Sequence, residues 1–336
     1  MNKFSWYEAK SVEDAVNKVN ATASDILGKA YNDSSVIFKA GGIDLLDLMK
    51  EGLVSPSTIV NIRNIPGLDK IEYNEKDGLK IGANVTLAEL ENNAIIREKY
   101  MALHQAIAHA GTPQLRNSAT LGGNLAQRTR CWYFRSIDHQ CYRKGSGTCY
   151  ALEGENEFHA IMNNKTCASV HSSSVSTALM AFNCTIEIAG TNGKTRSIDM
   201  EKFFVHPETD SRTENVLASN ELITGITIPA VDGNVKSYYI KQGARESHDW
   251  AIADVAVVVE ISGGQCKNAE IVLGAAAPVP IRAVEASKTL KGKAINESIA
   301  ASAGEESMKG ATPLANNAYK VPIFKSIVKR AILKTV

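Results

Sequence analysis

The chain has 336 residues, and its 37 basic and 36 acidic side chains leave a formal net charge of +1. This length exceeds one ordinary core and favours two or three packed units. The near-neutral charge provides no long-range field for nucleic acid or anionic lipid, so neither is an expected partner. The first residues lack a signal-peptide pattern, and no run approaches the roughly 18 apolar residues of a membrane span. We therefore expect a soluble, cytoplasmic protein without membrane contact.

The six cysteines indicate a local site and not a disulfide scaffold, because they are sparse for a chain of this length. Four of them fall between positions 131 and 167. In a cytosolic protein such a cluster points to metal binding or redox chemistry.

The N-terminal part predicts a helix over 12–19, capped by Ser11, and then a strand-turn-helix unit over 35–52. The turn carries Gly41 and Gly42. Backbone N–H groups without a Cβ obstruction at a helix start can bind a pyrophosphate. A Gly-Gly pair before a helix is also compatible with a plain tight connection, and there is no GxGxxG motif.

The middle of the chain predicts two or three short strands over 58–81, with a hairpin at Asp77-Gly78. A capping box at Thr86–Glu89 and a helix over about 97–110 follow. The next segment, Thr112–Cys149, joins a second glycine pair directly to the first cysteines. Two features typical of redox proteins therefore share one segment.

The remainder predicts an antiparallel hairpin around Asn192-Gly193, a strand over 221–229 and an α+β unit at the C-terminal end. That unit contains strands at 238–242, 253–261 and 269–274 and helices at 281–290, 295–308 and 321–333. Domain boundaries are expected near residues 60 and 230.

Four motifs occur in one order along nearly the whole chain: Ala40–Asp44, Thr120–Asn124, Tyr239–Lys241 and Leu273–Ala283. With them the chain resembles the FAD-binding medium subunit of the molybdenum hydroxylases, which include xanthine dehydrogenase, carbon monoxide dehydrogenase and aldehyde oxidoreductase. The resemblance implies an α+β fold: a two-subdomain FAD-binding unit of the vanillyl-alcohol oxidase type, followed by a three-stranded antiparallel sheet with helices. The expected units are 1–60, 61–229 and 230–336.

The resemblance also implies an FAD site in which both glycine pairs contact the pyrophosphate. Ala110 and Gly111 would lie by the isoalloxazine ring, and Lys241 near the polar edge of the flavin. Trp250 is either a flavin contact on a mobile loop or an ordinary aromatic. The full set of expected contacts is Lys39, Ala40, Gly41, Gly42, Ile43, Asp44, Ala110, Gly111, Thr120, Gly122, Gly123, Asn124, Ser173, Ser174, Ile223, Lys241 and Trp250.

Ile223 would lie near the adenine, and Ser173 and Ser174 would contact ribityl or ribose hydroxyls. Ser174 stands where the family usually has an acidic residue, and Ile43 where it often has threonine. The backbone donors of the first glycine loop survive the second change.

The cysteine segment, at about residues 128–167, resembles the insertion of 4-hydroxybenzoyl-CoA reductase and of the periplasmic aldehyde oxidoreductase. That resemblance implies a [4Fe–4S] cluster on Cys131, Cys141, Cys149 and Cys167. His159 and Cys184 are reserve candidates for the fourth ligand. The spacing is not the ferredoxin pattern, and from spacing alone structural zinc competes.

The aromatic run between Arg128, Arg130 and Arg135 is expected to cover the cluster. These arginines would balance its negative charge or contact a partner subunit. Cys184 and Cys266 lie on predicted strands and are read as buried small side chains.

The function implied by the resemblance is electron transfer, and no catalytic residue is expected in this chain. A molybdopterin-binding large subunit would oxidise the substrate, and a small subunit with two [2Fe–2S] clusters would pass electrons to FAD. An external acceptor such as NAD or ferredoxin would complete the chain. A periplasmic location would need an export signal on a partner. The alternatives are a stand-alone flavin reductase of the same fold and a zinc-stabilised binding module without redox activity.

Overall fold

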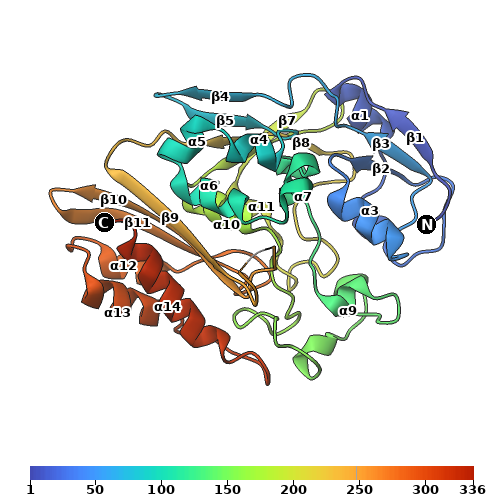
Figure 1. Ribbon diagram of the computed structural model, residues 1–336. Helices are drawn as coiled ribbons and strands as arrows, with labels where there is room; N and C mark the ends of the chain where they lie inside the picture. Colours follow the sequence, from blue (N-terminus) through green and yellow to red (C-terminus); the bar gives the residue numbers. More distant parts are fainter. Residues whose placement is uncertain (247) are drawn as a thin grey trace.

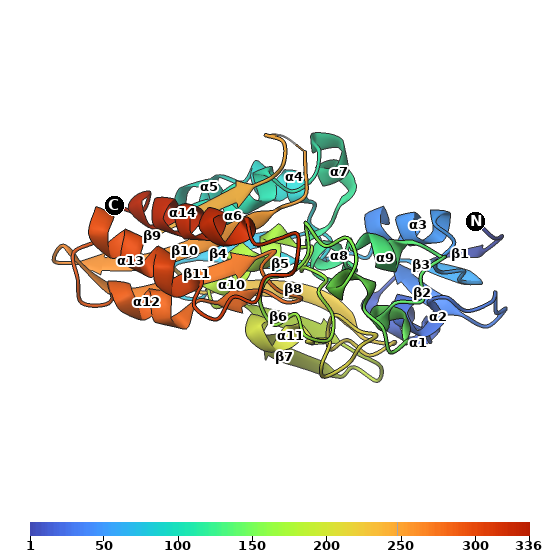
Figure 2. The same cartoon turned by 90° about the horizontal axis from the view of Figure 1, so that it is seen from below.

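The computed structural model describes residues 1–246 and 248–336 of the chain. Three β-sheets follow one another along the molecule, and helices cover them (Figure 1). Figure 2 shows the N-terminal sheet and the C-terminal helices at opposite ends. Within the described part, no helix has the length and apolar character needed to span a membrane.

The N-terminal unit is a parallel three-stranded sheet in the order β1-β3-β2. Its buried strand residues include Ile37, Ile59 and Val60. Its elements are β1 (Ser5–Glu8), α1 (Val12–Lys18), α2 (Ala23–Ile26), β2 (Val36–Lys39), α3 (Ile43–Lys50) and β3 (Thr58–Asn61). The predicted strand-turn-helix unit is confirmed, whereas β1 was not predicted, because its four residues are largely exposed and lack a pattern.

The central unit is an antiparallel five-stranded sheet in the order β4-β5-β8-β6-β7. Its strands are β4 (Ile71–Asn74), β5 (Gly78–Gly82), β6 (Thr185–Ala189), β7 (Thr195–Asp199) and β8 (Leu222–Ile228). Its helices are α4 (Leu87–Glu91), α5 (Ala94–Lys99), α6 (Met101–Ala108), α7 (Pro113–Ser118), α8 (Leu121–Leu125), α10 (Ser174–Ala181) and α11 (Met200–Phe203). Both predicted hairpins and the capping box of α4 are confirmed.

The single helix predicted over about 97–110 is wrong, because the chain breaks at Tyr100 into α5 and α6. Tyr100 leaves helical backbone geometry, with φ −124° and ψ 53°. Its ring is fully buried, and its hydroxyl donates to the carbonyl of Pro229 at 2.9 Å. Tertiary packing of one aromatic side chain thus interrupts an otherwise helical pattern.

The C-terminal unit is an antiparallel sheet of β9 (Val235–Gln242), β10 (Ala253–Ser262), β11 (Gln265–Gly274) and β12 (Ile281–Arg282). Three strands were predicted, and the short β12 adds a fourth strand at one edge of the sheet. Because β12 occupies residues 281 and 282, the helix that was predicted from residue 281 begins at residue 284. The helices α12 (Val284–Leu290), α13 (Glu297–Ser307) and α14 (Lys320–Leu333) follow.

Alternate residues of β10 point to opposite sides of this sheet. Val255 and Val257 pack in one core with α12, α13 and α14. Ala256 belongs to the other core, which it shares with α6 and α10. Helices on both faces explain why β10 reads as a nearly continuous apolar run. The domain limits expected near residues 60 and 230 stay predictions.

The cysteine segment has little regular structure beyond α9 (Trp132–Arg135) and the 3₁₀ turns Tyr142–Lys144 and Tyr150–Leu152. In Figure 1 it lies beneath α3. Phe134 and Cys141 share a core with Leu48 and Met49 of α3. The segment is therefore packed against the N-terminal unit.

A buried lysine connects this segment to the C-terminal unit. Lys320 is fully buried, and its ammonium donates to the carbonyls of His159 at 2.9 Å and Ala275 at 2.8 Å. Burial lowers the pKa of Lys320 to about 7, although the charge of Asp254 opposes the shift.

The lowered pKa of Lys320 predicts that the stability of the protein depends on pH. The unfolded chain, with a lysine pKa of about 10.4, binds more protons than the folded chain between pH 7 and 10. The contribution of Lys320 to the free energy of unfolding therefore increases as pH rises through that window, by up to about 1.4 kcal/mol per pH unit. Urea denaturation at pH 7 and 9.5 should show wild type gaining stability relative to Lys320→Met. Parallel profiles would contradict this, and Lys334→Met, at an exposed position, is the control.

Candidate functional site

A cleft of about 270 Å³ lies between the N-terminal and central units. One wall is the turn from β2 into α3, and the opposite wall is the start of α8. The third wall is the loop before β8. The lining residues are Ala21–Ser24, Ile37–Leu45, Leu48, Ile62, Ala83, Asn84, Ala119, Thr120, Gly122–Asn124, Ala126–Arg128, Arg130, Thr213–Asn215, Leu217–Ser219 and Glu221–Ile223.

The first glycine loop presents backbone donors to this cleft. Gly42 adopts a left-handed conformation, φ 83°, and caps α3 without any side-chain hydrogen bond. In the part of the chain that the structure describes, no hydrogen bond uses the backbone N–H groups of residues 40–45 as donors. A row of free N–H groups at a helix start is a site for an anion, because the helix dipole adds to the donors.

The second glycine loop contributes shape more than free donors. The N–H of Gly122 donates to the Ala83 carbonyl at 2.9 Å. The N–H of Gly123 donates to the Thr120 hydroxyl at 3.1 Å. A Cβ on Gly122 would lie 2.9 Å from Ala83 Cβ, so glycine is needed for close packing here. Free backbone donors are thus found at the first loop, whereas those of Gly122 and Gly123 have partners within the protein.

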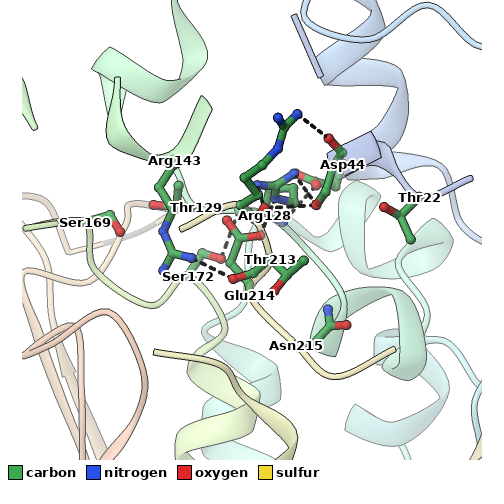
Figure 3. A network of polar contacts seen from close by, with 12 residues as sticks. Thr22, Asp44, Arg128, Thr129, Arg143, Ser169, Ser172, Thr213, Glu214 and Asn215 are labelled. Carbon is green, nitrogen blue, oxygen red and sulfur yellow. Dashed lines mark hydrogen bonds and ion pairs between the residues drawn. The ribbon is translucent and has the colours of Figure 1, made fainter. Parts of the chain in front are cut away.

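The loop before β8 is a wall that the sequence did not reveal. It is fixed by Arg128, whose guanidinium forms a buried ion pair with Glu214. The same guanidinium donates to the Ser24 hydroxyl at 3.0 Å and to the Arg212 carbonyl at 2.7 Å. Figure 3 shows Arg128 and Arg143 approaching the segment that carries Thr213 and Glu214. No local pattern marks these residues, because their role depends on contacts far apart in sequence.

The other expected FAD contacts fall into two groups. Ile223 lines the cleft, and Ser173 reaches it indirectly by donating to the Asn124 side chain at 2.6 Å. Ser174 lies at the start of α10, outside the lining. Asp44 lines the cleft, but its carboxylate is occupied by arginines.

The second group lies beyond the cleft lining. Lys241 donates to the His109 carbonyl at 2.9 Å, which places it beside Ala110 and Gly111. Burial lowers the pKa of Lys241, and the nearby Asp254 opposes the shift. The exposed ring of Trp250 lies 4.9 Å from the guanidinium of Arg130, which lines the cleft.

The cysteines of residues 131–167 surround a second, small cavity. Cys131, Cys141, Cys149 and Cys167 all line it, together with Arg143. Cys184 and Cys266 are buried in the two hydrophobic cores, as expected. His159 lies close by, with Nε2 3.2 Å from the sulfur of Cys131. Among the described residues, no three His, Cys, Asp or Glu side chains are grouped tightly enough to hold a single metal ion.

Burial is the main influence on the pKa of Cys131 and of His159, but not on that of Cys167. It raises the pKa of Cys131 to about 12 and lowers the pKa of His159 to about 4. The pKa of Cys167 is lowered to about 5, first through its contact with Cys149 and then through the Arg143 guanidinium.

The cations beside the cysteine cavity differ from those expected. Arg128, Arg130 and Arg135 pair with Glu214, Asp44 and Asp47. Arg143 and Lys144, which are 1% and 8% exposed, are the cations beside the cysteines. In the described structure neither of the two has a carboxylate within 4 Å.

A free helix start in a glycine-lined cleft is typical of proteins that bind a phosphate-bearing ligand. The comparisons with known proteins agree. The FAD binding domain in molybdopterin dehydrogenase matches residues 2–231, and the CO dehydrogenase flavoprotein C-terminal domain matches residues 238–335. The chain therefore belongs to the FAD-binding medium subunits of the molybdenum hydroxylase family and is an oxidoreductase flavoprotein subunit.

Individual relatives extend over nearly the whole chain. The aldehyde oxidoreductase FAD-binding subunit PaoB of Escherichia coli (strain K12) is 34% identical over 313 residues, which are 92% of this chain and 93% of that protein. The carbon monoxide dehydrogenase medium chain of Hydrogenophaga pseudoflava is 26% identical over 334 residues, 98% and 96% of the two chains. The structure of quinoline 2-oxidoreductase from Pseudomonas putida 86 shares the fold, with a TM-score of 0.75 at 23% identity over 99% of this chain and 97% of that one.

The glycine contacts predict the effect of one added methyl group. A Cβ on Gly41 would lie 2.1 Å from the Ser118 carbonyl oxygen, so Gly41→Ala must push the first glycine loop away from the end of α7. We expect FAD binding to weaken by about tenfold or more. The measurement is FAD retained per chain after gel filtration. Gly233→Ala, where an added Cβ meets nothing within 4 Å, is the matched control. Equal FAD content in both variants would contradict the prediction.

Proposed function

We propose that this chain is an electron-transfer subunit that holds FAD in the glycine-lined cleft and a [4Fe–4S] cluster on Cys131, Cys141, Cys149 and Cys167. The observation that carries the proposal is the juxtaposition of two sites in one segment. Asn124 lines the cleft and Cys131 lines the cysteine cavity. The seven residues from one to the other span at most about 25 Å when fully extended.

The residues present fit FAD. The free N–H groups of residues 40–45 suit the diphosphate, because they combine donors with the positive end of α3. Lys39, Ala40, Gly41, Gly42, Ile43 and Asp44 are its proposed contacts on this side, with Thr120, Gly122, Gly123, Asn124 and Ile223 opposite. Ala110, Gly111, Ser173, Ser174, Lys241 and Trp250 complete the proposed set.

The cysteine cavity fits an iron–sulfur cluster in charge as well as in ligand number. Four thiolates and a cubane together carry net negative charge. The buried Arg143 donates a hydrogen bond from Nη1 to the Thr213 carbonyl at 2.8 Å, and its Nε has no hydrogen-bond partner among the described residues. A buried cation without a carboxylate is costly unless another anion lies nearby. The cluster would be that anion.

A cluster and a zinc ion place different demands on the four cysteines. A zinc ion needs its donors about 2.0–2.3 Å from one point. A cubane has four separate irons, each bound by one thiolate, so its cysteines stand farther apart. The described residues offer no compact group of three donors, whereas four cysteines line one cavity. His159 and Cys184 are the less favoured candidates for the fourth ligand.

The proposed chemistry is electron relay, since FAD accepts electrons singly and releases them in pairs. Carbon monoxide dehydrogenase and nicotine 6-hydroxylase are among the relatives named as medium chains or subunits. By analogy, we propose a molybdopterin-binding large subunit, a small subunit with [2Fe–2S] clusters and an external acceptor such as NAD or ferredoxin as the partners of this chain. In this chain, Lys241 supplies positive charge beside Ala110 and Gly111, where it would stabilise an anionic reduced flavin.

A stand-alone reductase remains the second candidate, and the cleft argues against it. Such an enzyme needs a free acid or base near the flavin. The three carboxylates of the cleft lining, Asp44, Glu214 and Glu221, each pair with an arginine. These three carboxylates are therefore engaged in ion pairs and do not provide a free acid or base.

Spectra and metal analysis test the cluster. The purified protein should show flavin bands and a broad iron–sulfur absorption, with about four irons and four sulfides per chain. Cys141→Ser with Cys149→Ser should lose the iron and sulfide and keep the flavin. Cys266→Ser, at a buried cysteine outside the cavity, should keep both. Stoichiometric zinc without iron, or a full cluster in the double variant, would refute the proposal.

A further inference from the structure

The helix that offers its free start to the cleft also carries two carboxylates close to that start. Asp44 is the second residue of α3, and Asp47 lies one turn further on the same face. A carboxylate in the first turn stabilises a helix when nothing else binds there. For an anionic ligand the same charges are repulsive. Two uncompensated carboxylates would therefore oppose a diphosphate.

Two arginines of the cysteine segment compensate them. Arg130 lies 2.9 Å from Asp44 and 3.0 Å from Asp47. Arg135 lies 2.6 Å from Asp44 and 3.2 Å from Asp47. Each arginine bridges both carboxylates, so the four side chains form a closed, neutral group. The backbone N–H of Arg128 also donates to Asp44, at 3.0 Å.

The bridging guanidinium groups are well shielded from water. The side chains of Arg130, Arg135 and Asp44 are 18%, 12% and 16% exposed, whereas that of Asp47, at the edge of the group, is 44% exposed. Ion pairs shielded in this way are screened less by solvent than surface pairs. Removing one arginine would leave a net negative charge beside the start of α3.

The same two arginines flank a proposed cluster ligand. Arg130 directly precedes Cys131, and the backbone N–H of Arg135 donates to the Cys131 carbonyl at 2.9 Å. The Arg135 guanidinium also donates to the carbonyls of Thr129 at 2.9 Å and Arg128 at 3.2 Å. The position of the Cys131 loop therefore sets the position of both guanidinium groups.

We propose that Arg130 and Arg135 are positioning residues for the flavin diphosphate, which they admit to the start of α3 by neutralising Asp44 and Asp47. Because Cys131 lies between them, occupation of the cysteine cavity holds them in place and raises the affinity for FAD. The inference rests on the proposed function and adds a linkage between its two sites. It assigns these arginines to the flavin, although they belong to the cysteine segment.

The first test is FAD affinity, measured by quenching of flavin fluorescence on the FAD-free chain. Arg135→Met should weaken binding by about tenfold, because Arg130 alone then faces two carboxylates and the group is left with one net negative charge. Asp47→Asn should bind FAD as tightly as wild type or more tightly, since it removes negative charge. The double variant should recover most of the loss, as expected for a compensated pair. Weaker binding in Arg135→Met without a loss in Asp47→Asn distinguishes charge balance from general destabilisation.

Arg282→Met is the matched control. Arg282 also bridges two carboxylates, Glu201 and Glu270, and is 15% exposed, but it lies in β12 of the C-terminal sheet. The Arg282→Met variant should have an affinity for FAD within about twofold of wild type. Wild-type affinity in Arg135→Met, or no recovery in the double variant, would overturn the inference.

The second test is the linkage to the cluster. The same titration is made with iron–sulfur-loaded protein and with Cys141→Ser/Cys149→Ser protein. Loss of the cluster should weaken FAD binding several-fold in the wild-type background, and by less in the Arg135→Met background. Equal effects in both backgrounds would overturn the linkage. If wild-type protein binds no FAD at all, the proposed function itself fails; if it binds FAD and none of these differences appears, only this inference fails.

Discussion

The walls of the cleft depend on the contacts that the buried side chain of Arg128 makes. Its guanidinium reaches the loop before β8 through Glu214 and the Arg212 carbonyl, and the N-terminal unit through Ser24. Its backbone carbonyl accepts from the Ser172 hydroxyl at 3.2 Å. Three segments distant in sequence therefore meet at one residue. A buried ion pair is weak support for net stability. Its value here is geometric, because the guanidinium also donates to two segments that are far apart in sequence, at Ser24 and Arg212.

Local sequence rules were sufficient for the parts of the site that depend on backbone conformation. Gly42 at positive φ, the Thr86–Glu89 capping box and the Asn192-Gly193 turn are all properties of a few adjacent residues. The convergence of the four cysteines on one cavity also agrees with their grouping in the sequence. Such features are readable because the physical requirement and the residues that meet it lie together.

Long-range pairing accounts for what the sequence did not reveal. The strand β1 is fixed by parallel pairing with β3, about 50 residues away, and Tyr100 breaks a helix because of a partner at Pro229. The arginines near Cys131 looked like counter-ions for a cluster, but their partners are on α3 and in the loop before β8. Charge partners cannot be read from composition, because each depends on which surfaces meet after folding. The cations left beside the cysteines, Arg143 and Lys144, are identified only by burial.

The two glycine loops differ in how complete they are without a ligand. Around Gly122 and Gly123 the backbone donors already have partners within the protein, so that loop is pre-organised and gains no order when a cofactor arrives. The backbone donors around Gly41 and Gly42 have no acceptor among the described residues. Any conformational entropy lost when a ligand binds is therefore lost in this loop. One side of the cleft is therefore held by hydrogen bonds within the protein, and on the other side the start of α3 leaves its donors for a ligand. Reloading of a chain that has lost its flavin should consequently be a local adjustment at α3, with no refolding of the central unit.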